Sequence, residues 1–543
     1  MSRHFAMLVS SSPARSAIPS GDPAAKDSDH CGRYPQLHPV AGYDETEDKE
    51  EGDRLRADLA SRVLSGPGLW TDWLEELDRR GLIGDLLAEG VIEEAVATAP
   101  HGHQLDRVLN AKTTLICVLA GCLFPGEGYD TTLRITFGLP GLGLKPGTTV
   151  PAGPALSKAR ALLGEQVTRR AFELDAARSD IELGIGSAWH GMETTAFDGT
   201  TAELFNNDEL AGAFGVPTGG TKPKLRIVAH VRTGSRRWIG AAVGGYHDGE
   251  NALVDDLAST LRPGMLNLAD RGFFSMDRWI RFSATGAHLC WRVKNGAKSV
   301  PFKTLKTLPD GSELVLLHES NGMLTKRRRD IAGKTAPRLP DTIARLVQFT
   351  IVTRTARGRT KTSTIPVLTT LLGHAAFPAA GIAALYAERW QIEIAYLHLK
   401  KTLRGARRVL RGQSEVLARQ EAWAFLLVHN MVATVAARAA ALAGIDPDAI
   451  SFTAVLGLVR AHLQADTCCP HCGRRPASSA GDPLARLPAD VIAHPPNRTG
   501  RKRTSGRTPA ERRTRHTEDA TYTIAITPSN LPEWDQSLGS QGQ

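Results

Sequence analysis

The order of short strands and helices between residues 194 and 293 is the feature that most constrains the fold of this chain. At Glu193 the apolar pattern changes from helical spacing to β-prone runs that end at turn residues. The predicted strands cover residues 194–197, 224–232, 237–245, 265–269 and 288–293, and the predicted helices cover residues 253–261 and 276–283. This order, β-β-β-α-β-α-β, predicts an α/β domain built on an open sheet.

Two aspartates follow strands of this predicted sheet. Asp198 comes directly after the first strand, in Phe197-Asp198-Gly199-Thr200, and Asp270 comes directly after the fourth, in Asp270-Arg271-Gly272-Phe273. The ends of adjacent strands in an open sheet are where sites assemble. Since the first and fourth strands of such an order can lie side by side, we expect Asp198 and Asp270 to come together.

A third acidic position lies in a later polar stretch, Tyr386–Lys400. If the stretch is an α-helix, each residue advances by about 100°, which places Tyr386, Arg389, Glu393 and Lys400 within a stripe roughly 60° wide. A carboxylate flanked by cations suits a site that holds both a metal ion and a phosphodiester. The alternative is an ordinary solvated helix face with charge pairs one or two turns apart.

The rest of the chain divides by composition and periodicity. We expect a disordered leader (1–60), an N-terminal helical domain (61–185), the first part of the α/β core (186–296), a β-rich insertion (297–368), the second part of the core (369–445) and an irregular tail with a basic arm (446–543). The helical domain either docks on DNA or is a plain bundle that supports its neighbour. In the insertion, the run Lys326–Arg329 is predicted to be a basic turn.

Composition limits the partners and the compartment. The net charge of +9 and pI near 9.2 favour a polyanionic partner. The seven cysteines do not form a disulfide framework, and the N-terminal apolar run at residues 5–9 is too short for a signal peptide, so we expect a cytoplasmic protein. Residues 422–444 are apolar enough to suggest a membrane span, but His429, Asn430 and Arg438 favour a buried core helix.

The tail contains two further motifs. Cys469 and Cys472 have the C-x₂-C spacing of a zinc site, with Cys468 adjacent, but no second ligand pair follows at zinc-finger distance. Residues 497–515 hold eight Lys or Arg against one acid, which is typical of an arm for non-specific phosphate contact or of a solubilising tail. A second basic run, Lys401, Arg404, Arg407, Arg408 and Arg411, follows the Tyr386–Lys400 stretch directly.

Together these motifs resemble the RNase H-like core of DDE transposases. Tyr386, Arg389, Glu393 and Lys400 match the Y-(2)-R-(3)-E-(6)-K signature of the insertion sequence 4 family without a deviation. The two aspartate motifs match that family's first and second Asp motifs, and the helical block before them is similar to its N-terminal domain. The insertion falls between the fifth strand and the Glu helix, where members of the family carry one. The resemblance covers roughly residues 69–443 and leaves out the leader and the tail.

The resemblance implies a set of site residues. Asp198, Asp270 and Glu393 are expected to be the catalytic carboxylates and to bind two Mg²⁺ ions, with Mn²⁺ as a substitute. The residues expected to contact DNA phosphates are Tyr386, Arg389, Lys400, Lys401, Arg404 and Arg271. For Tyr386 a structural role is the alternative. Trp291 is expected either to stack on an unpaired base or to be a core residue.

The function implied is that of a cut-and-paste transposase, which cleaves double-stranded DNA at the terminal inverted repeats of its element and transfers the ends to target DNA. The resemblance to family members with the Y-R-E-K signature implies a DNA hairpin at the element end. The expected setting is a homodimeric synaptic complex associated with a bacterial nucleoid. Two alternatives remain open: a metal-dependent nuclease without strand transfer, and a DNA-binding regulator on an inactive transposase fold.

Overall fold

The structure is a computed structural model, and it divides the chain into two units. It describes residues 87, 90–100, 108–139, 148–177, 188–295, 300–330, 336–354, 360–406, 408–443, 446–447, 450–465, 521–529 and 531. The described parts of residues 43–260 and 391–496 form what we call the helical unit, and those of residues 261–390 and 497–543 form the insertion unit. The predicted leader, the cysteine motif and the arm at 497–515 lie outside the described residues.

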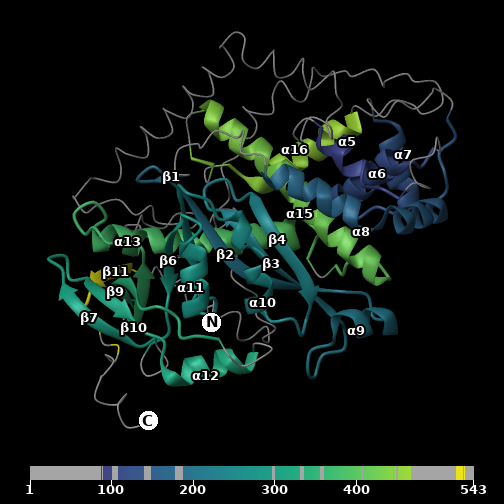
Figure 1. The fold of residues 1–543 in the computed structure, drawn as a ribbon. Coiled ribbons are helices and arrows are strands. Elements are labelled where there is room, and N and C mark those ends of the chain that lie inside the picture. Colours follow the sequence, from purple (N-terminus) through teal and green to yellow (C-terminus); the bar gives the residue numbers. More distant parts are fainter. Residues whose placement is uncertain are drawn as a thin grey trace, which may run out of the picture. The chain divides into compact units, whose positions relative to one another are not determined.

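Helices make up most of the helical unit (Figure 1). They are α5 (Val91–Val96), α6 (Ala111–Leu123), α7 (Tyr129–Phe137), α8 (Gly153–Ala177), α9 (Asp208–Phe214), α10 (Glu250–Asp255), α14 (Trp390–Leu397, whose first residue belongs to the insertion unit), α15 (Glu415–Ala443) and α16 (Phe452–Ala465). Two short turns, η2 (Ala258–Thr260) and the π-helical η5 (His398–Leu403), complete the set. The side chain of Asn110, the N-cap of α6, accepts a hydrogen bond from the backbone N–H of Thr113.

Helix α15 is the core helix of this unit, and it lies alongside α8 (Figure 1). Gln420 joins the two helices: its Oε1 accepts from Nε of Arg160 at 2.9 Å, and its Nε2 donates to the carbonyl oxygens of Arg160 and Gly164 at 3.0 and 2.7 Å. Gly164 has a φ of 74°, which kinks α8 at this point. Residues 415–441 have the length and hydropathy of a membrane span, but 83% of the apolar window is buried inside the protein, as expected for a core helix.

The sheet of the helical unit contains β1 (Ala188–Trp189), β2 (Met192–Glu203), β3 (Lys224–Arg232) and β4 (Trp238–Gly245). β3 lies between β2 and β4, and all of these pairings are antiparallel. The prediction that the first strand ends before Asp198 is wrong, because β2 continues to Glu203. Its pairing with β3 runs from Thr195↔Arg232 to Glu203↔Lys224, and these backbone hydrogen bonds outweigh the low strand propensity of Asp198 and Gly199.

The insertion unit has one long sheet in the order β5-β6-β10-β9-β8-β7. The strands are β5 (Met265–Ala269), β6 (His288–Arg292), β7 (Phe302–Thr307), β8 (Glu313–Leu317), β9 (Thr342–Arg354), β10 (Thr360–Thr369) and β11 (Thr521–Ile526). β5 and β6 are parallel, as a crossover through α11 (Met276–Ser283) requires, and the predicted insertion strands continue this sheet through antiparallel pairing of β10 with β6. Helix α13 (Ala379–Tyr386) and the turn η4 (Ala387–Arg389) complete the unit.

Two predictions about these regions are wrong. The run Lys326–Arg329 is not a turn, because it forms the last part of helix α12 (Asn321–Asp330). The tail is not irregular throughout, since α16 and β11 both belong to it. β11 pairs with the C-terminal half of β9, next to β8, which pairs with the N-terminal half. This contact joins residues about 170 positions apart in sequence, which local patterns do not reveal.

Candidate catalytic site

Asp198 is held in place within β2 by its immediate neighbours. Its Oδ1 accepts a hydrogen bond from the backbone N–H of Gly199 at 2.8 Å, and its carbonyl oxygen accepts from the hydroxyl of Tyr396 at 2.9 Å. Tyr396 lies on α14 and is buried, and burial together with the nearby carboxylates of Asp198 and Glu250 raises its pKa well above the ordinary value. The phenol therefore stays neutral and ties the Glu393 helix to the strand that carries Asp198.

Gly199 leaves room for a carboxylate that the sequence did not single out. A Cβ at this position would lie 2.9 Å from Oε1 of Glu250, at the start of α10. Nη1 of Arg226, on β3, binds the same Oε1 at 2.7 Å, and its Nη2 donates to the carbonyl oxygen of Tyr246 at 3.0 Å. A glycine inside a strand is the one sequence signal for such a close approach.

Glu393 and Lys400 lie on consecutive helical segments of the helical unit. Glu393 is half-buried on α14, and Lys400 is half-buried on η5. Nζ of Lys400 donates to Oγ1 of Thr200 at 3.0 Å, which places this cation two residues from Asp198 on β2. Burial, and then the positive charges of Arg404, Lys224 and Lys401, lower the pKa of Lys400. The lysine is thus a cation in a positive environment, and a phosphate would relieve that repulsion.

Asp270 follows the last residue of β5, as predicted, in the insertion unit. Its Oδ1 accepts from the backbone N–H of Arg271 at 2.8 Å, the same hydrogen bond that Asp198 makes with Gly199. Nη1 of Arg292, at the end of β6, lies 3.7 Å from the same oxygen. Arg271 itself is partly exposed. The carboxylate of Asp270 is therefore held by a backbone hydrogen bond and lies beside the Arg292 guanidinium.

Tyr386 and Arg389 are buried in the insertion unit, with 1% and 2% of their surface exposed. The hydroxyl of Tyr386 donates to the carbonyl oxygen of Ala269, the residue before Asp270, at 3.2 Å. Burial raises the pKa of Tyr386, and the charge of Arg389 acts in the opposite direction. This geometry matches the structural role that the sequence left open for Tyr386.

The four motif residues do not share one regular helix. Tyr386 ends α13, Arg389 lies in the 3₁₀ turn η4, Glu393 lies on α14 and Lys400 lies on the π-helical η5. Because 3₁₀ and π turns advance by angles other than 100° per residue, the α-helical spacing from which the stripe was derived does not hold along this stretch. The segment also passes from the insertion unit to the helical unit between Trp390 and Gln391.

The remaining predicted contacts differ in exposure. Lys401 is exposed, whereas Arg404 is mostly buried, and burial lowers its pKa. Arg408 donates to the carbonyl oxygen of Pro125, and Arg411 donates to those of Glu127 and Gly121 at 2.9 and 2.8 Å, so both arginines bind the end of α6 and the loop after it. Trp291 is fully buried and donates to Asn267 at 2.9 Å; base stacking is excluded for it, and the core alternative is confirmed.

The three carboxylates offer oxygen ligands, which Mg²⁺ and Mn²⁺ prefer. Their donor chemistry therefore fits a hard divalent cation. Among the residues that the structure describes, no group of three or more His, Cys, Asp or Glu side chains is placed to hold an ion. Asp198 and Glu393 belong to the helical unit and Asp270 to the insertion unit.

Comparison with known proteins identifies the family. The chain matches the family described as "Transposase DDE domain" over residues 189–431, and the one described as "Insertion element 4 transposase N-terminal" over residues 79–173. It is 26% identical over 387 residues to the transposase InsG for insertion sequence element IS4 of Escherichia coli (strain K12), covering 69% of this chain and 81% of that protein.

A solved structure of the piggyBac transposase in a synaptic complex with hairpin DNA covers 80% of this chain and 84% of its own, with a TM-score of 0.36 and 8% identity. That overlap is too loose to add to the assignment. The α/β architecture and the matched DDE domain confirm the expected RNase H-like core. The chain belongs to the insertion sequence 4 family of DDE transposases, enzymes that cleave and transpose DNA.

Proposed function

We propose that this protein moves its own insertion element by a cut-and-paste route: it cleaves DNA at the terminal inverted repeats and transfers the released 3′ ends to target DNA. The observation that carries the proposal is that two motif aspartates make the same hydrogen bond with the backbone. Oδ1 of Asp198 and Oδ1 of Asp270 each accept the backbone N–H of the next residue at 2.8 Å. A carboxylate held in this way is oriented before substrate binds, which electrostatic catalysis requires.

Divalent metal ions are the cofactors that DDE transposases use. Asp198, Asp270 and Glu393 would hold the ions, which we propose to be two Mg²⁺, replaceable by Mn²⁺. When bound, such ions supply an activated oxygen nucleophile and stabilise the leaving oxygen.

The chain's own cations would position the DNA backbone. Lys400 is suited to this because its ammonium is held by Thr200, close to Asp198 in sequence and on the same strand. Lys401 is exposed and Arg271 and Arg404 are partly exposed, so these three would contact flanking phosphates. Arg389 is 2% exposed, and its burial argues against the phosphate contact expected for it. For Tyr386 we propose a positioning role, since its hydroxyl binds the backbone next to Asp270.

The partners proposed are the double-stranded element ends and the target DNA. A homodimer would synapse the two ends, because both must be processed together. We place the protein in the cytoplasm, on the nucleoid.

The test uses the full-length protein, labelled DNA that carries an element end, and Mg²⁺. Wild type should cleave at the end and join the 3′ hydroxyl to a target plasmid, and a denaturing gel would separate a hairpin from an open end. Glu393→Gln should lose cleavage roughly a hundredfold or more, as expected for a metal ligand. Glu388→Gln, an acid in the same segment but outside the signature, is the matched control and should retain activity.

If Glu393→Gln cleaves DNA as well as wild type does, the assignment of Glu393 to the catalytic site is wrong. Cleavage without joining would favour the nuclease alternative, and DNA binding without any cleavage would favour the regulator.

A further inference from the structure

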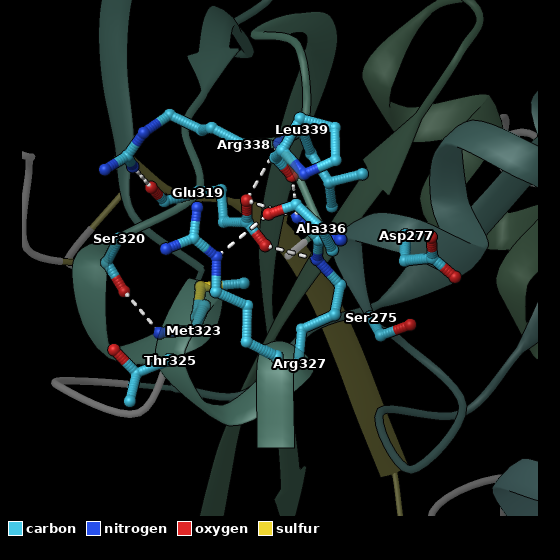
Figure 2. A network of polar contacts seen from close by, with 12 residues as sticks. Ser275, Asp277, Glu319, Ser320, Met323, Thr325, Arg327, Ala336, Arg338 and Leu339 are labelled. Carbon is cyan, nitrogen blue, oxygen red and sulfur yellow. Dashed lines mark hydrogen bonds and ion pairs between the residues drawn. The ribbon is translucent and has the colours of Figure 1, made fainter. Parts of the chain in front are cut away.

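Helix α12 of the insertion unit carries four consecutive cations in its last part, Lys326, Arg327, Arg328 and Arg329. Two of them face the protein. Nε and Nη2 of Arg327 donate to the two carboxylate oxygens of Glu319 at 2.8 and 3.0 Å, as Figure 2 shows. Nε of Arg328 donates to the carbonyl oxygen of Ala336 at 2.9 Å.

Glu319 is the residue at the centre of the contacts that attach α12 to the rest of the unit, which we call the anchor. The residue is 1% exposed, and its Oε2 also accepts from the backbone N–H of Leu339 at 2.8 Å. Arg338 donates to the carbonyl oxygen of Glu319 and to Oδ1 of Asn321, the first residue of α12 (Figure 2). The hydrogen bonds from Arg327 hold the pKa of Glu319 below its usual range. The helix is therefore fastened near both its ends, and its outer face is fixed in orientation.

The other two cations face solvent. Lys326 and Arg329 are exposed, and their spacing of three residues places them on one face of the helix. Within the described part of the chain, neither is paired with a carboxylate. Helix α12 thus presents two exposed positive charges that no carboxylate among the described residues neutralises.

The inward-facing side of α12 lies near the helix that follows the second aspartate motif in the same unit. The pKa of Arg327 is raised by its hydrogen bonds to Glu319 and, in smaller part, by the charge of Asp277. Asp277 lies in the first turn of α11, the helix that follows the loop after Asp270, and Figure 2 draws it beside the anchor. Helix α12 therefore lies beside the start of α11.

We propose that Lys326 and Arg329 form a DNA-backbone contact that is independent of sequence and that holds the duplex next to the Asp270 loop. The inference rests on the proposed function, because it takes DNA as the substrate. Phosphate groups match the observed chemistry: two exposed cations, one of them a guanidinium fork, on a rigid support. Backbone contacts of this kind supply affinity and register but no base readout.

The test compares Lys326→Ala/Arg329→Ala with wild type by fluorescence anisotropy, over a range of KCl concentrations, on an end-containing duplex and on an unrelated duplex. Each phosphate contact contributes about 0.9 to the slope of log K against log salt. The double variant should reduce that slope by about 2 on both duplexes. Lys303→Ala/Lys306→Ala, which removes the same charge from exposed positions on β7, is the matched control and should keep the slope.

An unchanged slope in the α12 variant overturns the inference, as does an equal reduction in the β7 control, which would show an effect of net charge alone. A lower melting temperature with an unchanged slope would assign the two cations to the helix dipole instead. Failure of the proposed function has a different result: wild type would not cleave end DNA, whereas the slope comparison could still be made.

Discussion

The hydroxyl of Tyr386 donates a hydrogen bond to the carbonyl oxygen of Ala269, at 3.2 Å. Ala269 is the last residue of β5, and the next residue is Asp270. The first residue of the Y-R-E-K signature is thereby attached to the strand that presents the second aspartate. Two motifs that are more than 100 residues apart in sequence are joined inside one unit.

Tyr386→Phe should therefore lower stability and catalysis without weakening DNA binding. Removing the hydroxyl leaves a buried carbonyl oxygen without its donor, at a cost of about 1 kcal/mol. Urea unfolding measures the stability, and anisotropy on end DNA measures the affinity. If affinity falls and its salt dependence decreases, the phenol contacts phosphate, and the positioning role is wrong.

Lys400→Met should stabilise the protein at pH 7 while it reduces cleavage. Burial lowers the pKa of Lys400 below its ordinary 10.5, so the folded state binds this proton more weakly than the unfolded chain does. The charged lysine consequently costs stability at pH values below its folded-state pKa, and that cost disappears as the pH rises through the folded-state pKa towards 10.5. Thermal unfolding measured from pH 7 to 10 should show that the extra stability of the Met variant over wild type decreases as the pH rises. A variant that is less stable than wild type at pH 7 would contradict this.

Thr200→Val should reduce cleavage more than Thr200→Ser does. Thr200 Oγ1 accepts the hydrogen bond from Lys400, and serine keeps that acceptor whereas valine keeps only the shape. The expected effect of valine is a loss of about 1 kcal/mol in transition-state stabilisation, or roughly fivefold in rate. Single-turnover cleavage rates of the two variants provide the measurement. Equal rates would show that this hydrogen bond does not position the lysine.

Gly199→Ala should destabilise the fold, because its Cβ would lie 2.9 Å from the carboxyl group of Glu250, which Arg226 holds at 2.7 Å. Because the Glu250 side chain is 43% exposed and can shift at the expense of its ion pair with Arg226, the expected cost is below about 1 kcal/mol. The double variant Gly199→Ala/Glu250→Ala removes the clash and should recover part of the loss. A double-mutant cycle by urea unfolding gives the coupling, and strictly additive losses would show that the two residues do not clash.

Glu319→Gln should lower the free energy of unfolding by about 3 kcal/mol at pH 7, since it leaves Arg327 without its carboxylate. The hydrogen bonds from Arg327 lower the folded-state pKa of Glu319 below 4.5, so the stabilisation is present above the unfolded-state pKa and is lost as the pH falls through the folded-state pKa. The difference between wild type and variant should therefore shrink below about pH 4. Glu173→Gln, which removes an exposed pair with Arg169, should change stability by less than about 1 kcal/mol.

By itself the sequence determined the order of the helices and strands, and it contains the motifs by which the family is recognised. Helical and strand periodicity, turn residues and the spacing of Asp198, Asp270 and Glu393 are local features, and local features act over a few residues. They placed α11 and most of the strands predicted between residues 194 and 293 close to their observed bounds.

Only the tertiary structure decided how those residues are held. β2 runs through Asp198 because it pairs with β3, and Tyr386 lies against Ala269 because helix α13 is buried. Glu250 reaches Gly199, and β11 pairs with β9, through contacts between distant parts of the sequence. Such contacts depend on which surfaces meet after folding, and no window of neighbouring residues contains that information.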